Sequence, residues 1–120
     1  MDKGSVDRWL EAYISAWKSY DRDEIGALFA DDVSYRYHPY DQPLEGRDAV
    51  VESWLGEDRD EPGTYDASYR AVAVDGDVAV ATGTSSYTGD PPSVFHNCFV
   101  MRFDADGRCR DFTEWYVQAP

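Results

Sequence analysis

Apolar positions in the first half of the chain recur at helical spacing. Residues 6–20 carry one such series, at steps of four, three and four, which places its members on one face of a helix: Val6, Leu10, Tyr13 and Trp17. Ser5 is a suitable N-cap for this helix. Residues 47–56 carry a shorter apolar series and predict a further helix.

A short helix is predicted between these two. Asp21 and Glu24 have the spacing of a capping box, so the helix begins at Asp21. Its apolar side consists of Ile25, Leu28 and Phe29. Residues 30–32 are expected to end it. The chain shows no repeat, low-complexity tract or second domain.

Strand-like segments fill the rest of the chain. Residues 33–38 form a first strand, which Pro39 ends because proline cannot donate to a strand ladder. Four more strands follow, joined as two hairpins by turns rich in Asp and Gly: residues 65–74, 78–87, 94–103 and 108–117. Helices ahead of antiparallel strands are typical of an α+β domain. We expect one domain over residues 1–120, a cone-shaped α+β barrel in which three helices pack in the concave face of a curved antiparallel sheet around an internal pocket.

The composition is rich in aromatic and in acidic residues. Aromatic side chains make up 15% of the chain, with nine Tyr and four Trp, and such side chains suit a core, an interface or a cavity wall. The formal net charge of -13 repels phosphate backbones and anionic membranes. We therefore expect no nucleic-acid and no membrane partner, and we attribute the charge mainly to solubility.

The two cysteines offer no metal or redox motif. Cys98 and Cys109 are not closely spaced, and His96 beside Cys98 supplies too few ligands for a metal, so we expect no metal and no cofactor. The N-terminus lacks an apolar signal segment, and no apolar run approaches the ~20 residues of a membrane span. A cytoplasmic protein with reduced thiols is the resulting expectation.

Three segments carry a family resemblance: LFADDV at 28–33, PLEGRDAV at 43–50 and VMRFDADGR at 100–108. Through them the chain resembles the nuclear transport factor 2-like superfamily, in the branch of SnoaL-like proteins and ketosteroid isomerases. The resemblance covers nearly the whole chain and implies the cone-shaped fold. It implies little about the reaction, because this fold hosts unrelated functions.

The resemblance also suggests where the catalytic groups of ketosteroid isomerases would fall. Their helical oxyanion-hole tyrosine falls on Tyr13, and their base falls on Tyr37 or His38. Their second oxyanion donor falls on Phe99, which can neither hold an enolate nor move a proton. We therefore expect no steroid isomerase activity.

Side-chain alternation in the last two strands, taken in the parity of that superfamily, sorts residues toward the pocket. The inward set is Phe95, Asn97, Phe99, Met101, Phe112, Glu114 and Tyr116. A four-residue turn at 104–107 would place Phe99 opposite Phe112, and Asn97 opposite Glu114. The other expected pocket residues are Trp17, Tyr35, Tyr37 and Trp54.

Three side chains are candidates for chemistry. Burial among rings would raise the pKa of Glu114 and make it a general acid or base near neutral pH. Alternatively, Glu114 is structural and held by Asn97 or Tyr13. His38 stands where the relatives place a base, or it packs at a strand end beside Pro39. Tyr13 donates to a ligand oxygen, or it is an ordinary core residue.

These residues fit more than one function. In the first, Glu114 or His38 moves a proton on a small, largely apolar carbonyl or hydroxyl compound, as an isomerase, cyclase, dehydratase or hydrolase would. Tyr13 and Asn97 then hold the developing charge. In the second, the pocket binds a small ligand without turnover. In the third, the domain is an interaction module, and the resemblance implies a homodimer through the outer face of the sheet.

Overall fold

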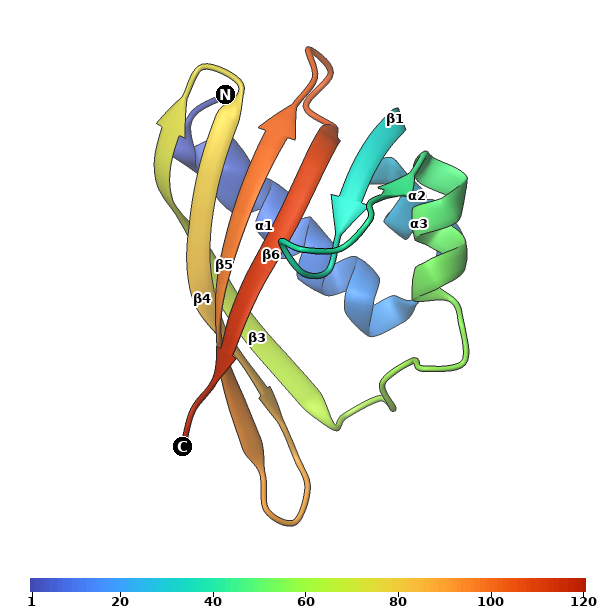
Figure 1. The fold of residues 1–120 in the computed structure, drawn as a ribbon, viewed down its shortest axis with the longest axis vertical. Coiled ribbons are helices and arrows are strands. Elements are labelled where there is room, and N and C mark those ends of the chain that lie inside the picture. Colours follow the sequence, from blue (N-terminus) through green and yellow to red (C-terminus); the bar gives the residue numbers. More distant parts are fainter.

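The computed structural model describes residues 1–120 and contains three helices and six strands (Figure 1). The helices are α1 (Lys3–Ser19), α2 (Arg22–Ala27) and α3 (Arg47–Trp54). The strands are β1 (Phe29–Arg36), β2 (Leu44–Glu45), β3 (Tyr65–Asp75), β4 (Val78–Tyr87), β5 (Ser93–Phe103) and β6 (Cys109–Gln118). None of the helices combines the length and the apolar character that crossing a membrane requires.

Helix α1 begins at Lys3, earlier than the apolar series predicted. Asp2 is its N-cap, because the Asp2 carboxylate accepts from the Ser5 backbone N–H at 2.8 Å. Ser5 Oγ accepts in return from the Asp2 backbone N–H at 3.0 Å, which completes a capping box. Ser5 is therefore inside the helix, and its prediction as the cap was wrong. Asp21 caps α2 as predicted, by accepting from the Glu24 backbone N–H.

The second helix is shorter than predicted and the first strand begins earlier. Helix α2 ends at Ala27, and Phe29 opens β1 instead of closing the apolar side of a helix. The reason is tertiary: Phe29 pairs with Cys109 of β6, and the Cys109 backbone N–H donates to Leu28 O at 2.9 Å. Strand β2, which the sequence did not predict, pairs with β1 at the sheet edge.

The sheet has the strand order β2-β1-β6-β5-β4-β3. Neighbouring strands are antiparallel except β1 and β6, which run parallel, so the sheet is mixed and not wholly antiparallel as expected. Parallel neighbours need a long connection, and here it includes α3 and the β3–β4–β5 meander. Because β2 and β3 remain as free edges, the curved sheet is an open cone that does not close into a barrel.

The three helices lie on the concave side of the sheet, and α1 crosses it (Figure 1). The interface between them is an aromatic core centred on Phe112 of β6, which is 0% exposed. Its ring stacks on Tyr35 at 4.6 Å and on Tyr13 at 5.8 Å, and lies 5.1 Å from the ring of Phe99. Tyr13 and Tyr35 of this core also line the cavity described below.

The β5–β6 hairpin has a register two residues away from the predicted one. Glu114 lies opposite Phe99 instead of Asn97, and Phe112 lies opposite Met101. The turn is one residue longer than expected, and a bulge where the strands leave it adds another. A shift of two residues returns each side chain to its original face. The predicted pairs were therefore wrong, but Asn97 and Glu114 still point to the same side.

Candidate functional site

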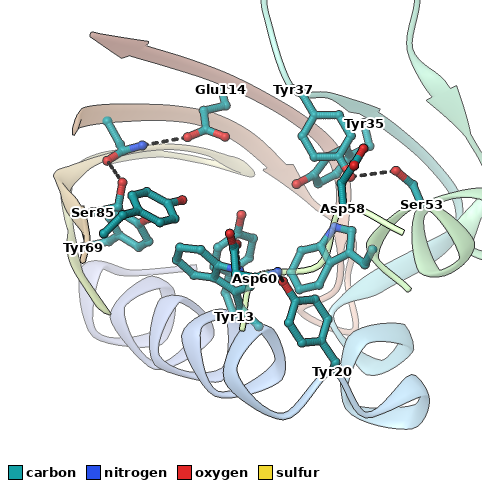
Figure 2. A pocket seen from close by; sticks show the side chains of 14 residues that line it. Tyr13, Tyr20, Tyr35, Tyr37, Ser53, Asp58, Asp60, Tyr69, Ser85 and Glu114 are labelled. Atoms are coloured by element: carbon teal, nitrogen blue, oxygen red, sulfur yellow. Dashed lines mark hydrogen bonds between the residues drawn. The ribbon is translucent and has the colours of Figure 1, made fainter. Parts of the chain in front are cut away.

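A cavity of about 390 Å³ lies between α1, α3 and the concave face of the sheet (Figure 2). Eight of its 14 lining residues are aromatic: Tyr13, Trp17, Tyr20, Tyr35, Tyr37, Trp54, Tyr69 and Tyr87. The other six are polar or acidic: Ser53, Asp58, Asp60, Ser85, Asn97 and Glu114. The lining contains three carboxylates and no Lys, Arg or His.

Glu114 is held at the wall of this cavity by a hydrogen-bonded chain across three strands. Asn97 Nδ2 on β5 donates to Glu114 Oε2 on β6 at 2.7 Å. Ser85 Oγ on β4 donates to Asn97 Oδ1 at 3.0 Å, and both groups are buried. Figure 2 shows the Glu114 carboxyl, fixed at one oxygen by this chain. No protein group bonds to the other oxygen, Oε1, so it is free for a ligand.

The environment of Glu114 favours its neutral form. Burial raises the pKa of Glu114 to about 7, while the hydrogen bond from Asn97 and the nearby His38 act in the opposite direction. Near neutral pH the carboxyl therefore exists in both protonation states. A group in this condition can accept a proton or give one up.

Hydrogen-bond donors line the wall formed by α1, β1 and α3. Burial raises the pKa of Tyr13 and of Tyr35 well above the ordinary value, and the charge of Glu114 acts in the same direction, so both phenols stay protonated. Trp54 is 8% exposed, and its Nε1–H is the one buried side-chain polar atom without a partner. An unpaired buried donor costs about 1–3 kcal/mol. The nitrogen has almost no accessible surface, so neighbouring protein atoms cover it.

The loop between α3 and β3 lines another part of the cavity and is fixed to α1 through Asp60. The Asp60 carboxylate accepts from Trp17 Nε1 at 3.1 Å, and its backbone N–H donates to the Tyr20 hydroxyl at 2.9 Å. Tyr20 is the C-cap of α1 and has φ 48°, a left-handed conformation that is uncommon outside glycine. This backbone conformation directs the Tyr20 side chain toward the cavity.

Apart from His38, the residues predicted for the site fall into three groups. Seven line the main cavity: Tyr13, Trp17, Tyr35, Tyr37, Trp54, Asn97 and Glu114. Phe95 and Tyr116 line an adjoining hollow of about 440 Å³, which shares Asn97 and Glu114 with the first. The remaining three are 0% exposed and lie in the core, not in the lining: Phe99, Met101 and Phe112.

His38 lies outside both cavity linings. Its Nδ1 is 2.9 Å from Asp41 Oδ2, its Nε2 is 2.8 Å from the Tyr116 hydroxyl, and its ring stacks on Tyr40 at 5.1 Å. With both nitrogens engaged by protein groups, His38 is not placed to move a proton on a molecule in the main cavity. Its influence on Glu114 is electrostatic and lowers the pKa of that carboxyl.

Sequence reasoning missed half of the cavity lining. Tyr69, Ser85 and Tyr87 come from the β3–β4 hairpin, and strand alternation in residues 78–87 could have indicated the last two. Tyr20, Asp58 and Asp60 come from a helix end and a loop, for which the sequence has no periodic signal. Ser53 lies on the side of α3 that faces Tyr37, and its Oγ is 2.7 Å from the Tyr37 hydroxyl.

The carboxylates of the cavity do not form a metal site. No group of three or more His, Cys, Asp or Glu side chains is close enough to hold a metal ion. Both cysteines are free thiols, and burial strongly raises the pKa of Cys109. What the site offers is therefore one acid near neutrality, several neutral donors and an aromatic enclosure.

Solved structures with the same fold include proteins of different description. An LEH-like epoxide hydrolase from M. tuberculosis aligns with a TM-score of 0.68 and 20% identity, over 96% of this chain and 84% of that chain. An NTF2-like protein of unknown function from Burkholderia xenovorans LB400 aligns with a TM-score of 0.68 and 17% identity, over 98% of this chain and 88% of that chain. At these identities the likeness shows the fold alone.

Sequence comparison places the chain in a family. No curated protein matches it. Residues 10–112, from α1 to the middle of β6, match the SnoaL-like domain. The match includes the main-cavity residues from Tyr13 to Asn97 and ends two residues before Glu114. The chain therefore belongs to the SnoaL-like domain family.

Proposed function

We propose that this domain binds a small, largely apolar molecule in its aromatic cavity and transfers a proton to or from it through Glu114. The placement of the Glu114 carboxyl carries this proposal: Asn97 fixes one oxygen at 2.7 Å, and the other has no partner within the protein. A positioned acid whose pKa lies near the working pH is the usual requirement for acid–base catalysis.

The groups around Glu114 have different proposed roles. Asn97 donates to Glu114 and accepts from Ser85, so it positions the carboxyl instead of holding charge on the substrate. Tyr13 and Tyr35 supply protonated donors that would bind a carbonyl or hydroxyl oxygen. Isomerase, cyclase, dehydratase and hydrolase reactions all fit a proton transfer beside such an oxygen.

Binding without turnover is the second candidate. It is favoured by the position of His38, the other titratable group expected at the site, which lies outside the cavity with both ring nitrogens engaged. Glu114 then lacks His38 as a partner in acid–base chemistry. In this case the Glu114 carboxyl anchors the ligand and performs no chemistry.

A ligand screen distinguishes the two candidates. Small carbonyl and hydroxyl compounds are tested for a rise in melting temperature with the wild type and with Glu114→Gln, and each hit is followed for product by mass spectrometry. Glu11→Gln, at an exposed position of α1, makes the same substitution outside the cavity. Catalysis predicts product with the wild type and Glu11→Gln but none with Glu114→Gln. Binding without product by the wild type and Glu11→Gln, weakened in Glu114→Gln, would contradict proton transfer and leave a binding module.

We further propose a homodimer through the outer sheet face. Trp115 and Val117 of β6 are 42% and 70% exposed there, and they lie opposite Cys98 and His96 of β5. A free apolar face of this kind is typical of a subunit contact. Sedimentation equilibrium tests it: Trp115→Ser with Val117→Ser should yield monomer, and a monomeric wild type would contradict it.

We also propose a cytoplasmic location, which the free thiols of both cysteines fit.

A further inference from the structure

Tyr116 connects the adjoining hollow to a hydrogen-bonded chain that begins outside it. The Tyr116 hydroxyl is 2.8 Å from Nε2 of His38, and Nδ1 of the same ring is 2.9 Å from Oδ2 of Asp41. Of these three residues, only Tyr116 lines a cavity, and it does so together with Asn97 and Glu114. The chain therefore ends in the hollow that also contains the carboxyl of the proposed proton transfer.

Glu114 and Tyr116 lie two residues apart on β6, and both line this hollow. Residues at this spacing along a strand have Cα atoms about 7 Å apart and side chains that point to the same face. Phe95 of β5 also lines the hollow, and its ring lies 5.5 Å from the ring of Tyr116. A molecule in the hollow can thus contact the Glu114 carboxyl and the Tyr116 phenol together.

Asp41 sets the direction of the hydrogen bonds in the chain. A carboxylate only accepts hydrogen bonds, so Nδ1 of His38 carries a hydrogen whether the ring is neutral or charged. In the neutral ring Nε2 is then an acceptor, and the Tyr116 hydroxyl donates to it. In the protonated ring Nε2–H donates to the Tyr116 oxygen instead, and the phenol hydrogen is free to turn toward the hollow. Tyr116 therefore donates to a ligand only when His38 is protonated.

Packing fixes the chain in place, while water still reaches His38. The His38 ring stacks on Tyr40 at 5.1 Å with an interplanar angle of 13°, and it lies 5.3 Å from the ring of Tyr116. The Asp41 backbone N–H donates to His38 O at 3.1 Å, which holds the two residues in one turn. The side chains of His38 and Asp41 are 33% and 32% exposed, so His38 can take up a proton from solvent after each transfer.

We propose that Tyr116 is a second catalytic residue of this site, and that His38 and Asp41 are the positioning residues that supply and orient its proton. Glu114 takes a proton from a carbon beside a carbonyl, and the Tyr116 hydroxyl protonates the carbonyl oxygen, so a ketone becomes its enol. The carbon–hydrogen bond and the phenol O–H bond break, and Nε2–H of His38 returns a proton to the phenol oxygen. The inference rests on the proposed proton transfer by Glu114 and adds the acid with which that carboxyl works.

Hydrogen exchange at the α-carbon of 2-tetralone, a small and largely apolar ketone, tests this pairing. Deuterium uptake from D₂O is followed by mass spectrometry with the wild type, Glu114→Gln and Tyr116→Phe. Tyr116→Phe keeps the ring and removes only the hydroxyl, so we expect kcat to fall about 100-fold with little change in KM. Tyr40→Phe removes a hydroxyl outside both cavity linings and should exchange at the wild-type rate.

The pH profile distinguishes a supply of protons from a purely structural hydrogen bond. Wild-type kcat/KM should rise as Glu114 ionises and fall as His38 loses its proton. His38→Gln keeps a hydrogen-bonding side chain beside Tyr116 but removes the titrating ring. The falling limb should then move to higher pH, where phenols ionise. The titratable groups that face His38 are Asp41, Tyr116, the stacked Tyr40 and, through its charge, Glu114.

The outcomes distinguish this inference from the function on which it rests. A wild-type rate in Tyr116→Phe, with no exchange by Glu114→Gln, overturns the role of Tyr116 and leaves proton transfer by Glu114 standing. A falling limb that stays in place in His38→Gln overturns the proton supply through His38. No exchange by the wild type overturns the inference together with the proposed proton transfer. Circular dichroism shows that each variant is folded.

The ligand-free protein provides a test that needs no substrate. The ¹⁵N chemical shifts of the His38 ring show which nitrogen carries the hydrogen when the ring is neutral. We expect it on Nδ1, bonded to Asp41, with Nε2 accepting from Tyr116. A hydrogen on Nε2 of the neutral ring would reverse the chain and overturn the inference.

Discussion

Asn97 and Glu114 are joined by a 2.7 Å hydrogen bond although they are not paired across the sheet. Asn97 lies opposite Tyr116, and Glu114 lies opposite Phe99, so the bond runs along the diagonal of the β5–β6 ladder. Diagonal neighbours on one face are within reach of long side chains. The contact leaves one carboxyl oxygen facing the cavity, and the proposed chemistry depends on that oxygen.

Glu114 should make the protein less stable as the pH rises. Its pKa in the folded protein is about 7 against an ordinary value of 4.5, so the folded state binds the proton more tightly than the unfolded state. The contribution of Glu114 to the free energy of unfolding is fully present below pH 4.5. It is lost as the pH rises to 7. Glu114→Gln should therefore gain roughly 1–3 kcal/mol relative to wild type at pH 8.

Urea denaturation of both proteins between pH 4.5 and pH 8 measures this difference. Glu11→Gln, which removes an exposed carboxylate of the same chemistry, should follow the wild-type profile. A Glu114→Gln profile parallel to wild type across this range would show that Glu114 titrates as an ordinary surface group.

Removal of the Asn97 amide should raise the pKa of Glu114 further. The hydrogen bond from Asn97 is the larger of the two effects that lower this pKa and oppose the effect of burial. In Asn97→Ala the carboxylate loses that stabilisation, so its pKa should exceed the wild-type value. Infrared difference spectra of the carboxyl band, recorded as a function of pH, measure the pKa of Glu114. An unchanged or lower pKa would mean that the 2.7 Å bond does not hold the ionised form.

Gly83 of β4 should not tolerate a side chain. A Cβ at this position would lie 2.0 Å from Ser68 O and 2.8 Å from Tyr69 Cα, because β3 passes close beside it. We expect Gly83→Ala to lose about 1–3 kcal/mol of unfolding free energy, or more.

Gly26→Ala provides the comparison for this substitution. A Cβ at Gly26, within α2, meets only ordinary contacts, at 3.6 Å from Arg47 and 3.9 Å from Val51. It should gain about 0.5–1 kcal/mol through helix propensity. Equal denaturation midpoints for the two variants would contradict the close approach of β3 to β4.

Loss of the Tyr20 hydroxyl should loosen the loop that lines the cavity. Tyr20 accepts the Asp60 backbone N–H at 2.9 Å, so Tyr20→Phe leaves that amide without its partner. We expect a loss of about 1 kcal/mol in local stability and faster hydrogen exchange at Asp60. Tyr40→Phe, at a side chain that is 81% exposed, should leave exchange at Asp60 unchanged. Unaltered protection in Tyr20→Phe would show that Trp17 alone fixes the loop.

The parts of the fold that are local in sequence were predictable. Strand β4 spans the predicted residues 78–87, because alternation and the turns on either side define it. The parity of β5 and β6 was also correct, since Asn97 and Glu114 share a face. The predicted register of the β5–β6 hairpin was wrong, because an added turn residue and a bulge leave no signal in the alternation of side chains.

The parts that depend on distant contacts were not predictable. Phe29 was assigned to a helix because its spacing fits one, but pairing with β6 draws it into a strand. Asp60 joins the cavity only through bonds to Trp17 and Tyr20. His38 was expected near the reaction centre, and its bonds to Asp41 and to the Tyr116 hydroxyl hold it outside. Such pairings are set by tertiary structure and not by residue type.

The titration of Glu114 in the ligand-free wild type tests the central claim most directly. With ¹³C-labelled glutamate, the side-chain carboxyl resonance is assigned by its absence in Glu114→Gln and followed from pH 3 to pH 9. The account predicts a midpoint of about 7, set by burial against the cavity wall. A midpoint near 4.5, the ordinary value for glutamate, would place the carboxyl in water and contradict its role as the acid or base of this site.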